Sequence, residues 1–239
     1  VCGQSIRRSL EASESYSGSI KVPYNRETGA SFPVKNNIFS VQPLMNHSSS
    51  SVILASQSPR RIELLKQVIT DFKVIPSEVE EVLHPDRSPE ENAEALGLEK
   101  ANWVAKHNPG HWVIGADTVV VLDEEIIGKP TDDEDARRIL KRLSGKEHQV
   151  VTGVAVVHLK TASTTTVSRV RIKPLTHEEI VTYVDSGEPL DKAGAYAIQG
   201  KGASLVDGFD GSYTNIIGLP IETLKDLLQQ AGYPDKLTS

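Results

Sequence analysis

The sequence predicts one α/β or α+β domain, residues 51–235, built on a strongly twisted mixed sheet flanked by helices. Three observations support this fold class. From Ser51 onward, short apolar runs typical of strands alternate with segments of helical periodicity. Several of the helical segments begin with a capping signal. Two long apolar segments, 148–159 and 164–175, are joined by a short connection, which predicts a hairpin of long strands and therefore a mixed sheet.

The strand candidates are apolar runs bounded by turn residues. They are residues 51–56, 72–77, 112–122, 125–129, 148–159 and 164–175. Residues 123–125 predict a tight turn, and residues 159–163 predict the turn of the long hairpin.

The helix candidates begin at residues that cap helices. Ser58 and Pro59 suit the N-cap and the first position of a helix over 58–69. Capping boxes, in which Ser or Thr pairs with a Glu one turn later, open the segments 88–108, 131–145 and 176–187. The box of the middle segment is Thr131 with Glu134. A last helix is predicted at 221–232, directly after Pro220.

Residues 1–50 have a different composition from the rest of the chain. Ser, Asn, Gly and Pro are scattered through them without a sustained period, which is typical of disorder. We expect a disordered or foreign extension, with folding beginning near Ser51 and with Met45, the only methionine, as a candidate start. The alternatives are a targeting peptide or a regulatory tail. The acidic residues Glu11, Glu14 and Glu27 disfavour a transit peptide.

Charge and hydropathy exclude several classes of partner. The net charge is −6, so no global positive field would attract a nucleic acid polymer or an anionic membrane. No apolar run approaches the ~18–20 residues needed to span a bilayer. Cys2 is the only cysteine, which rules out an intramolecular disulfide and suits a reducing compartment. We therefore expect a cytoplasmic protein.

The phrase Ser-Pro-Arg-Arg, at 58–61, predicts an anion site. A helix N-terminus offers unpaired N–H groups and the positive end of the helix dipole. The hydroxyls of Ser56 and Ser58 add donors, and the guanidinium groups of Arg60 and Arg61 can hold phosphate oxygens bidentately. The alternative is that the arginines are solvated or pair with Glu63. Arginine at a helix start opposes the dipole, which favours a bound anion.

Asp117 interrupts a strand that is otherwise made of Val and Ile. A carboxylate there is costly unless it is paired or ligates a cation. It could bind Mg²⁺ or act as a general base toward water. The alternative is a structural aspartate that accepts backbone N–H bonds.

Other polar residues give weaker signals. Lys129, between Gly and Pro, suits a fixed positive charge for phosphate, or it is an ordinary surface lysine. Lys100 by itself indicates a solvated helix face, and one carboxylate of Glu80 and Glu81 could reach a metal or face solvent. Gln199 lies in a segment rich in Gly and Ala, and its amide matches the edge of a nucleobase. The alternative for Gln199 is a turn cap.

Taken together, these phrases resemble the Maf family of nucleotide pyrophosphatases, also described as septum-formation inhibitors. The matching segments occur in family order over about residues 51–222. They are ILASQSPRR, SEVEE, EKA, IGADTVV, GKP, RLSGKEHQVVTGVAV, EPLDKAGAYAIQGKGA and GSYTNIIGLPI. Residues 1–50 lie outside the resemblance. Ala197 stands where glycine is common in the family, and we expect little consequence from that.

The resemblance implies a two-lobed fold around an elongated twisted mixed sheet, similar to that of inosine-triphosphate pyrophosphatases, with the active site in a central cleft. It implies hydrolysis of nucleoside triphosphates to the monophosphate and pyrophosphate, with a divalent cation, Mg²⁺ or Mn²⁺. The catalytic aspartate of the family falls on Asp117, and Glu81 would assist at the metal. The phosphate-binding residues of the family fall on Arg60, Arg61, Lys100 and Lys129.

The resemblance also implies a substrate preference. Members that favour dTTP, UTP and related pyrimidines carry Arg, Thr and Gln at three positions, which here are Arg60, Thr118 and Gln199. The 7-methyl-GTP branch of the family has other residues there. A homodimer is a further expectation at the level of the family. Two alternatives stay open: a non-enzymatic, nucleotide-binding regulator of division, and an inosine-triphosphate pyrophosphatase.

Overall fold

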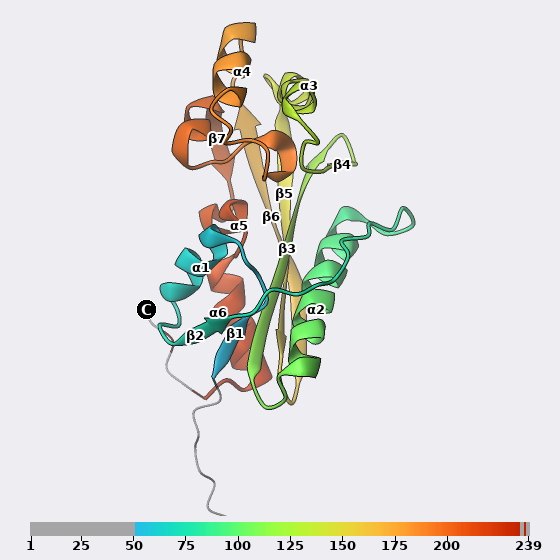
Figure 1. Ribbon diagram of the computed structural model, residues 1–239, viewed down its shortest axis with the longest axis vertical. Coiled ribbons are helices and arrows are strands. Elements are labelled where there is room, and N and C mark those ends of the chain that lie inside the picture. The colour runs from blue at the N-terminus through green and yellow to red at the C-terminus, as the bar shows by residue number, and fades with distance from the viewer. Residues whose placement is uncertain (1–50, 235–236, 238–239) are drawn as a thin grey trace, which may run out of the picture. The chain divides into compact units, whose positions relative to one another are not determined.

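A seven-stranded mixed sheet forms the centre of the domain in the computed structural model, which describes residues 51–234 and 237 (Figure 1). The strand order is β2-β1-β3-β5-β6-β7, and β4 pairs with β3. The strands are β1 (Val52–Leu54), β2 (Phe72–Val74), β3 (Trp112–Leu122), β4 (Glu125–Ile127), β5 (Glu147–Val157), β6 (Thr161–Ile172) and β7 (Val206–Asp210). Strand β1 is parallel to β2 and β3, and all other pairs are antiparallel. The predicted mixed sheet is confirmed; the extension predicted at 1–50 lies outside the described residues.

The helices follow the predicted order, with additions near the C-terminus. They are α1 (Pro59–Lys66), α2 (Pro89–His107), α3 (Asp133–Leu143), α4 (His177–Val184), α5 (Tyr213–Ile217) and α6 (Ile221–Ala231). Two short 3₁₀ helices, η1 (Ala193–Ala195) and η2 (Gly200–Leu205), lie in the Gly- and Ala-rich segment. Strand β7, helix α5 and both 3₁₀ helices were not predicted, because they lie in the Gly- and Ala-rich segment 187–220, which shows neither a sustained apolar run nor a helical period. None of the helices in the described residues is long and apolar enough to cross a membrane.

One of the three predicted capping boxes is wrong. The boxes of α2 and α4 are present as predicted. For α3, the N-cap is Asp132, whose carboxylate accepts the N–H of Asp135 at 2.8 Å, rather than Thr131 with Glu134. Aspartate caps a helix at least as well as threonine, so the acidic run allows the box to move by one residue. The N–H of Thr131 instead donates to the Asp135 carboxylate at 3.1 Å.

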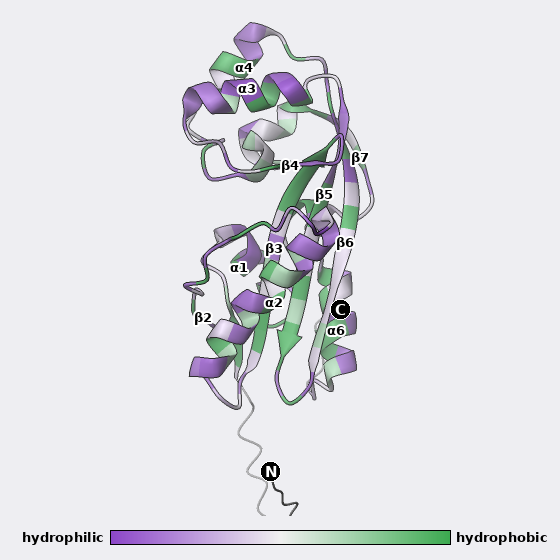
Figure 2. Cartoon of the chain, turned by 90° about the vertical axis from the view of Figure 1, so that its right-hand side faces the viewer, coloured by the Kyte–Doolittle hydropathy of each residue, from purple (hydrophilic) through white to green (hydrophobic). Residues whose placement is uncertain are grey.

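Two hydrophobic clusters on one face of the sheet explain the predicted two lobes. Alternate residues of β3 point to opposite faces. Ile114 joins the cluster under α1 and α6, and Leu122 joins the cluster under α3 and α4. Val113 and Val121 point the other way, into clusters that contain residues of α2. Figure 1 shows α2 beside β3. Strands β3 and β5 therefore serve both clusters, and Figure 2 shows β5 hydrophobic along most of its length beside a paler β6.

Helix α2 packs so closely against β3 and β5 that their backbones are in contact. A Cβ atom added to Gly153 would lie 2.1 Å from the carbonyl oxygen of Ala93, and one on Gly115 would lie 2.3 Å from that of Gly97. Glycine is required at such approaches because it has no side chain. This contact brings Lys100 of α2 onto the strand that carries Asp117.

On the side opposite β5, strand β3 pairs with β1 at one end and with β4 at the other, and it has an open edge between them. Its pairing with β1 ends at Ile114, whose carbonyl also accepts the N–H of Ala55 at 2.8 Å. Its pairing with β4 begins only at Val120. None of the described strands therefore pairs with residues 115–119 on this side, and the predicted Asp117 and Thr118 lie in the middle of this open edge.

Substituting Gly153→Ala should lower the free energy of unfolding by more than about 3 kcal/mol, because the new methyl group meets the α2 backbone. Urea denaturation followed by circular dichroism measures the change. Gly128→Ala is the matched control, since a Cβ there meets nothing within 4 Å. Equal stability of the two variants would contradict the close approach of α2.

Candidate active site

A cavity of about 430 Å³ lies at the open edge of β3, between the two lobes. The residues that line it include nearly all of the predicted site: Ser56, Ser58, Arg60, Arg61, Glu81, Lys100, Thr118, Lys129 and Gln199. Asp117 is the exception. Its side chain contacts Lys100, which lines the cavity, because it points to the α2 face of the sheet while Thr118 points to the other.

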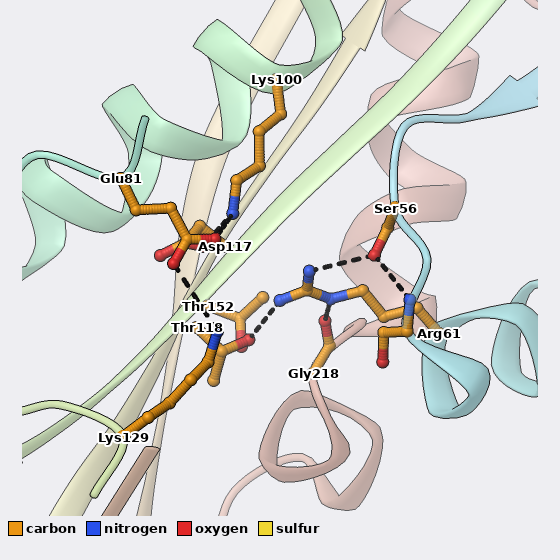
Figure 3. A network of polar contacts seen from close by, with 10 residues as sticks. Ser56, Arg61, Glu81, Lys100, Asp117, Thr118, Lys129, Thr152 and Gly218 are labelled. Carbon is orange, nitrogen blue, oxygen red and sulfur yellow. Dashed lines mark hydrogen bonds and ion pairs between the residues drawn. The ribbon is translucent and has the colours of Figure 1, made fainter. Parts of the chain in front are cut away.

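A buried ammonium group joins two carboxylates. Lys100 Nζ lies 2.5 Å from Asp117 Oδ1 and 2.6 Å from Glu81 Oε1 (Figure 3). The side chains of Lys100 and Asp117 are only 8% and 10% exposed, so the two charges depend on each other. Lys100 is therefore not the solvated lysine that its helix suggested. Two of its three N–H groups are used by the carboxylates, so its contact with phosphate is limited to the third.

Glu81 extends this cluster toward the solvent. Burial raises the pKa of its carboxyl, but the hydrogen bond and the charge of Lys100, with the charges of Lys129 and Arg61, outweigh burial and hold the pKa below its usual range. Glu81 Oε2 also lies 3.7 Å from Lys129 Nζ, and both side chains are about half exposed. Glu81 is thus an ionised carboxylate at the mouth of the cavity.

Arg61 connects three separate elements. Its Nε donates to the carbonyl of Gly218 at 2.8 Å, and its terminal nitrogens donate to Thr118 Oγ1 at 3.0 Å and to Ser56 Oγ at 3.4 Å (Figure 3). Burial lowers the pKa of this guanidinium below its ordinary value, against the opposing charges of Asp117 and Glu81. An arginine stays charged even so. Its remaining N–H groups can still face an anion in the cavity.

Arg60 and Ser58 are less constrained. The guanidinium of Arg60 lies 3.9 Å from the carboxylate of Asp191, across the cavity, and one third of its side chain is exposed. Ser58 is the N-cap of α1, as predicted, but its side chain makes no capping bond. Its N–H donates to Ser56 Oγ at 3.2 Å. Arg60 and the start of α1 are therefore available to a ligand.

A chain of buried polar groups continues from Thr118, which lines the cavity, into the protein. Thr118 Oγ1 lies 3.0 Å from Thr152 Oγ1, which donates to the carbonyl of Asn215 at 3.1 Å. The Asn215 amide donates to Ser168 Oγ at 2.9 Å and to the carbonyl of Val150 at 3.0 Å. This chain fixes Thr118, which in turn orients Arg61.

The donor set fits a divalent cation only in part. Asp117 and Glu81 offer carboxylate oxygens side by side, which are ligands that Mg²⁺ and Mn²⁺ prefer. In the described residues, no group of three or more His, Cys, Asp or Glu side chains gathers in one place. The residues therefore suit an ion that takes its remaining ligands from water and phosphate oxygens.

Comparison with known proteins identifies the family. The family described as "Maf-like protein" matches residues 51–231. The chain belongs to the Maf family. A relative from Dictyoglomus thermophilum is 50% identical over 186 residues, 76% of this chain and 96% of the relative. A relative from Symbiobacterium thermophilum is 50% identical over 77% of this chain and 95% of the relative. A relative from Myxococcus xanthus is 46% identical over 80% of this chain and 97% of the relative. All three are named dTTP/UTP pyrophosphatase.

Part of the wall of the Maf cavity is formed by the loop 191–199. Gln199 and Tyr196 line it together with apolar side chains from β3, β5 and α5. Tyr196 is buried, and its hydroxyl lies 2.7 Å from Nε2 of the buried His148 on β5. Nδ1 of His148 has no hydrogen-bond partner among the described residues. Apolar side chains beside an amide suit a nucleobase.

Several residues of the site were missed from the sequence. His148, Thr152 and Asn215 lie on segments that read as ordinary strand or loop, and only their buried positions reveal a role. Glu188 and Tyr183 also support the loop around Gln199. A polar residue within an apolar run, such as Thr152, is the one signal that could have found them.

His148 makes the stability of the Maf domain dependent on pH. Burial lowers its pKa from 6.5 to about 4. Between these values the unfolded chain binds a proton at this ring and the folded protein does not, so the free energy of unfolding falls as the pH falls from 6.5 to about 4. The loss should be about 3 kcal/mol.

The test compares wild type with His148→Gln by urea denaturation across this pH range. The variant should be less stable at neutral pH, but the difference between the two proteins should shrink toward pH 4, where the ring of the wild type protonates. Parallel curves would contradict a buried neutral His148.

Proposed function

We propose that this Maf protein hydrolyses nucleoside triphosphates to the monophosphate and pyrophosphate, and that it prefers dTTP, UTP and related modified pyrimidine nucleotides. The relatives named dTTP/UTP pyrophosphatase support the reaction and the preference. The observation that carries the proposal is the pair of carboxylates, Asp117 and Glu81, held by Lys100 beside a cavity lined with further cations. Removal of unwanted nucleotides from the pool is the role that fits such an activity.

In this proposal the triphosphate binds through the basic residues. Arg60, Lys129 and the start of α1 hold phosphate oxygens, assisted by the serine hydroxyls and by the free N–H groups of Arg61. Polyphosphate carries several negative charges, so binding replaces the weak contacts of Arg60 with Asp191 and of Lys129 with Glu81. Catalysis is then mostly positioning and electrostatic stabilisation.

Asp117 is the proposed base. Its carboxylate takes a proton from a water molecule whose oxygen bonds to the α-phosphorus. The bond between that phosphorus and the oxygen bridging to the β-phosphate breaks, and pyrophosphate leaves with its charge stabilised by Lys129 and Arg61. Lys100 holds the carboxylate in place for this step. A Mg²⁺ or Mn²⁺ ion held by Asp117 and Glu81 would screen the phosphate charge.

Gln199 is the proposed reader of the base. Its amide both donates and accepts, which matches the adjacent carbonyl and N–H groups shared by uracil and thymine. Cytosine presents the reverse pattern and is disfavoured unless the Gln199 amide flips. Arg60 and Thr118 are the other proposed selectivity residues. Thr118 accepts a hydrogen bond from Arg61, so we assign it an indirect effect.

The cellular setting also belongs to the proposal. We place the enzyme in the cytoplasm, where its nucleotide substrates are made, and we expect neither a nucleic acid polymer nor a membrane as partner. The homodimer implied by the resemblance stays a prediction.

The reaction is tested by incubation with dTTP and Mg²⁺ followed by analysis of the phosphate products. We expect dTMP and pyrophosphate. Release of inorganic phosphate, or no turnover, would favour a nucleotide-binding regulator, and preference for ITP over dTTP would favour an inosine-triphosphate pyrophosphatase.

Asp117→Asn should lower kcat by about three orders of magnitude or more, because the amide cannot accept the proton. The expected effect on the fold is smaller than on activity, and circular dichroism checks it. Lys66→Met, which removes a surface lysine paired with Glu63, is the control. Turnover of Asp117→Asn near that of wild type would show that another group is the base.

Substituting Gln199→Glu should reduce kcat/KM for dTTP about tenfold or more, with a smaller effect on purine triphosphates, because the amide donor is lost. Parallel kinetics with dTTP, dCTP and dGTP measure the preference. An equal loss for all three nucleotides would contradict a role in base selection.

A further inference from the structure

The loop that carries Gln199 is held on both sides by one tyrosine and one glutamate. Before Gln199, the N–H of Ala197 donates to the hydroxyl of Tyr183 at 3.3 Å. After Gln199, the N–H groups of Lys201 and Gly202 donate to the carboxylate of Glu188 at 3.1 and 3.0 Å. The Tyr183 hydroxyl donates to the same carboxylate at 3.1 Å, which joins the two arms of the loop.

Close backbone contacts tighten the same loop. A Cβ added to Gly202 would lie 2.4 Å from the carbonyl oxygen of Ala197 and 2.7 Å from the Tyr183 hydroxyl, so the two arms touch. Gly200 has a φ of +65°, and a Cβ there would lie 2.9 Å from Glu188 Oε2. Glycine is therefore required at both positions for the loop to close around the Tyr183–Glu188 pair.

The loop takes its rigidity from the lobe of α3 and α4. Tyr183 lies on α4 and is only 4% exposed, within the cluster that also contains Leu140, Leu143 and Val184. Gln199 itself is exposed and lines the cavity. The flexible, exposed side chain of Gln199 is thus attached to a backbone that the buried Tyr183 holds in place.

Neither Tyr183 nor Glu188 needs to touch the nucleotide to matter. We infer that Tyr183 and Glu188 are positioning residues that set the base preference of the enzyme by holding the backbone on both sides of Gln199. This inference rests on the proposed pyrimidine pyrophosphatase activity and on the role of Gln199 in it.

The protonation states support this arrangement over the working pH range. Burial and the neighbouring Glu188 carboxylate raise the pKa of the Tyr183 hydroxyl, so it keeps its proton and donates. Burial raises the pKa of Glu188, but the N–H groups of Gly202 and Lys201 and the Tyr183 hydroxyl outweigh it, so the net pKa is low and the group stays an acceptor.

Loosening the loop should affect the base and not the phosphates. Without the hydrogen bonds of Tyr183 and Glu188, the loop samples conformations in which Gln199 cannot reach the nucleobase. Nucleotide binding must then overcome the entropy cost of ordering the loop. The hydrogen bonds that are lost join Tyr183 and Glu188 to residues 197–202 and none of them reaches Arg60 or Lys129, so we expect the triphosphate contacts to be unchanged. The predicted signature is therefore a higher KM for dTTP, a nearly constant kcat, and constant inhibition by inorganic tripolyphosphate, which has no base.

The experiment uses Tyr183→Phe, which removes only the hydroxyl, and Glu188→Gln, which keeps the shape of the carboxylate. Tyr213→Phe and Glu178→Gln are matched controls on exposed residues that do not line the cavity. The ratio of kcat/KM for dTTP to that for dGTP should fall about tenfold in each test variant and stay within about twofold in the controls. Inhibition by tripolyphosphate should stay within about twofold throughout.

A double-mutant cycle separates positioning from a general structural effect. In a Gln199→Ala background, Tyr183→Phe should cause no further loss of the dTTP preference, because the side chain that Tyr183 and Glu188 position is gone. Thermal unfolding checks that each variant folds. If Tyr183→Phe does not fold, Glu188→Gln decides the question through the same ratio and the same cycle.

Three results would overturn the inference: an unchanged preference in the test variants, an equal loss for dTTP, dGTP and tripolyphosphate, or additive effects with Gln199→Ala. Failure of the proposed function would look different, because wild type itself would then release no pyrophosphate from dTTP.

Discussion

The buried ammonium of Lys100 is the interaction on which the site depends. Without its positive charge, the carboxylates of Asp117 and Glu81 would face each other at the wall of the cavity, and Asp117 would be an unpaired charge in an apolar strand. Loss of one partner of a buried ion pair commonly costs about 3–5 kcal/mol. Lys100 reaches this place only because glycines on β3, β5 and α2 let the helix approach the sheet at backbone distance.

The open edge of β3 explains how residues on two faces of a sheet serve one cavity. Neighbouring side chains of a strand point in opposite directions, so Asp117 meets Lys100 on one face while Thr118 meets Arg61 on the other. Where β1 has ended and β4 has not begun, no strand separates the faces. A ligand can therefore contact cations on both sides of the sheet, in a cavity that the α1 residues and the Gln199 loop also line.

Much of the fold and the candidate site could be predicted from the sequence, and the failures have physical reasons. Periodicity revealed the long strands and capped helices, while β7, α5 and the 3₁₀ helices lie in a Gly- and Ala-rich segment without an apolar run or a helical period. The motifs predicted which residues gather, but not the partners of Lys100 or Arg61, because those contacts join segments far apart in the chain. Tyr183 and Glu188 read as ordinary helix and loop residues, since their role follows only from where the loop 197–202 folds back.

The central claim is that water attacks the α-phosphorus of a triphosphate held at the open edge of β3, with Asp117 as base. Hydrolysis of dTTP in water labelled with the heavy isotope of oxygen tests this claim most directly, with both products weighed by mass spectrometry. We predict that the label appears in dTMP and that pyrophosphate carries none. Label in pyrophosphate would place the attack at the β-phosphorus and contradict the account.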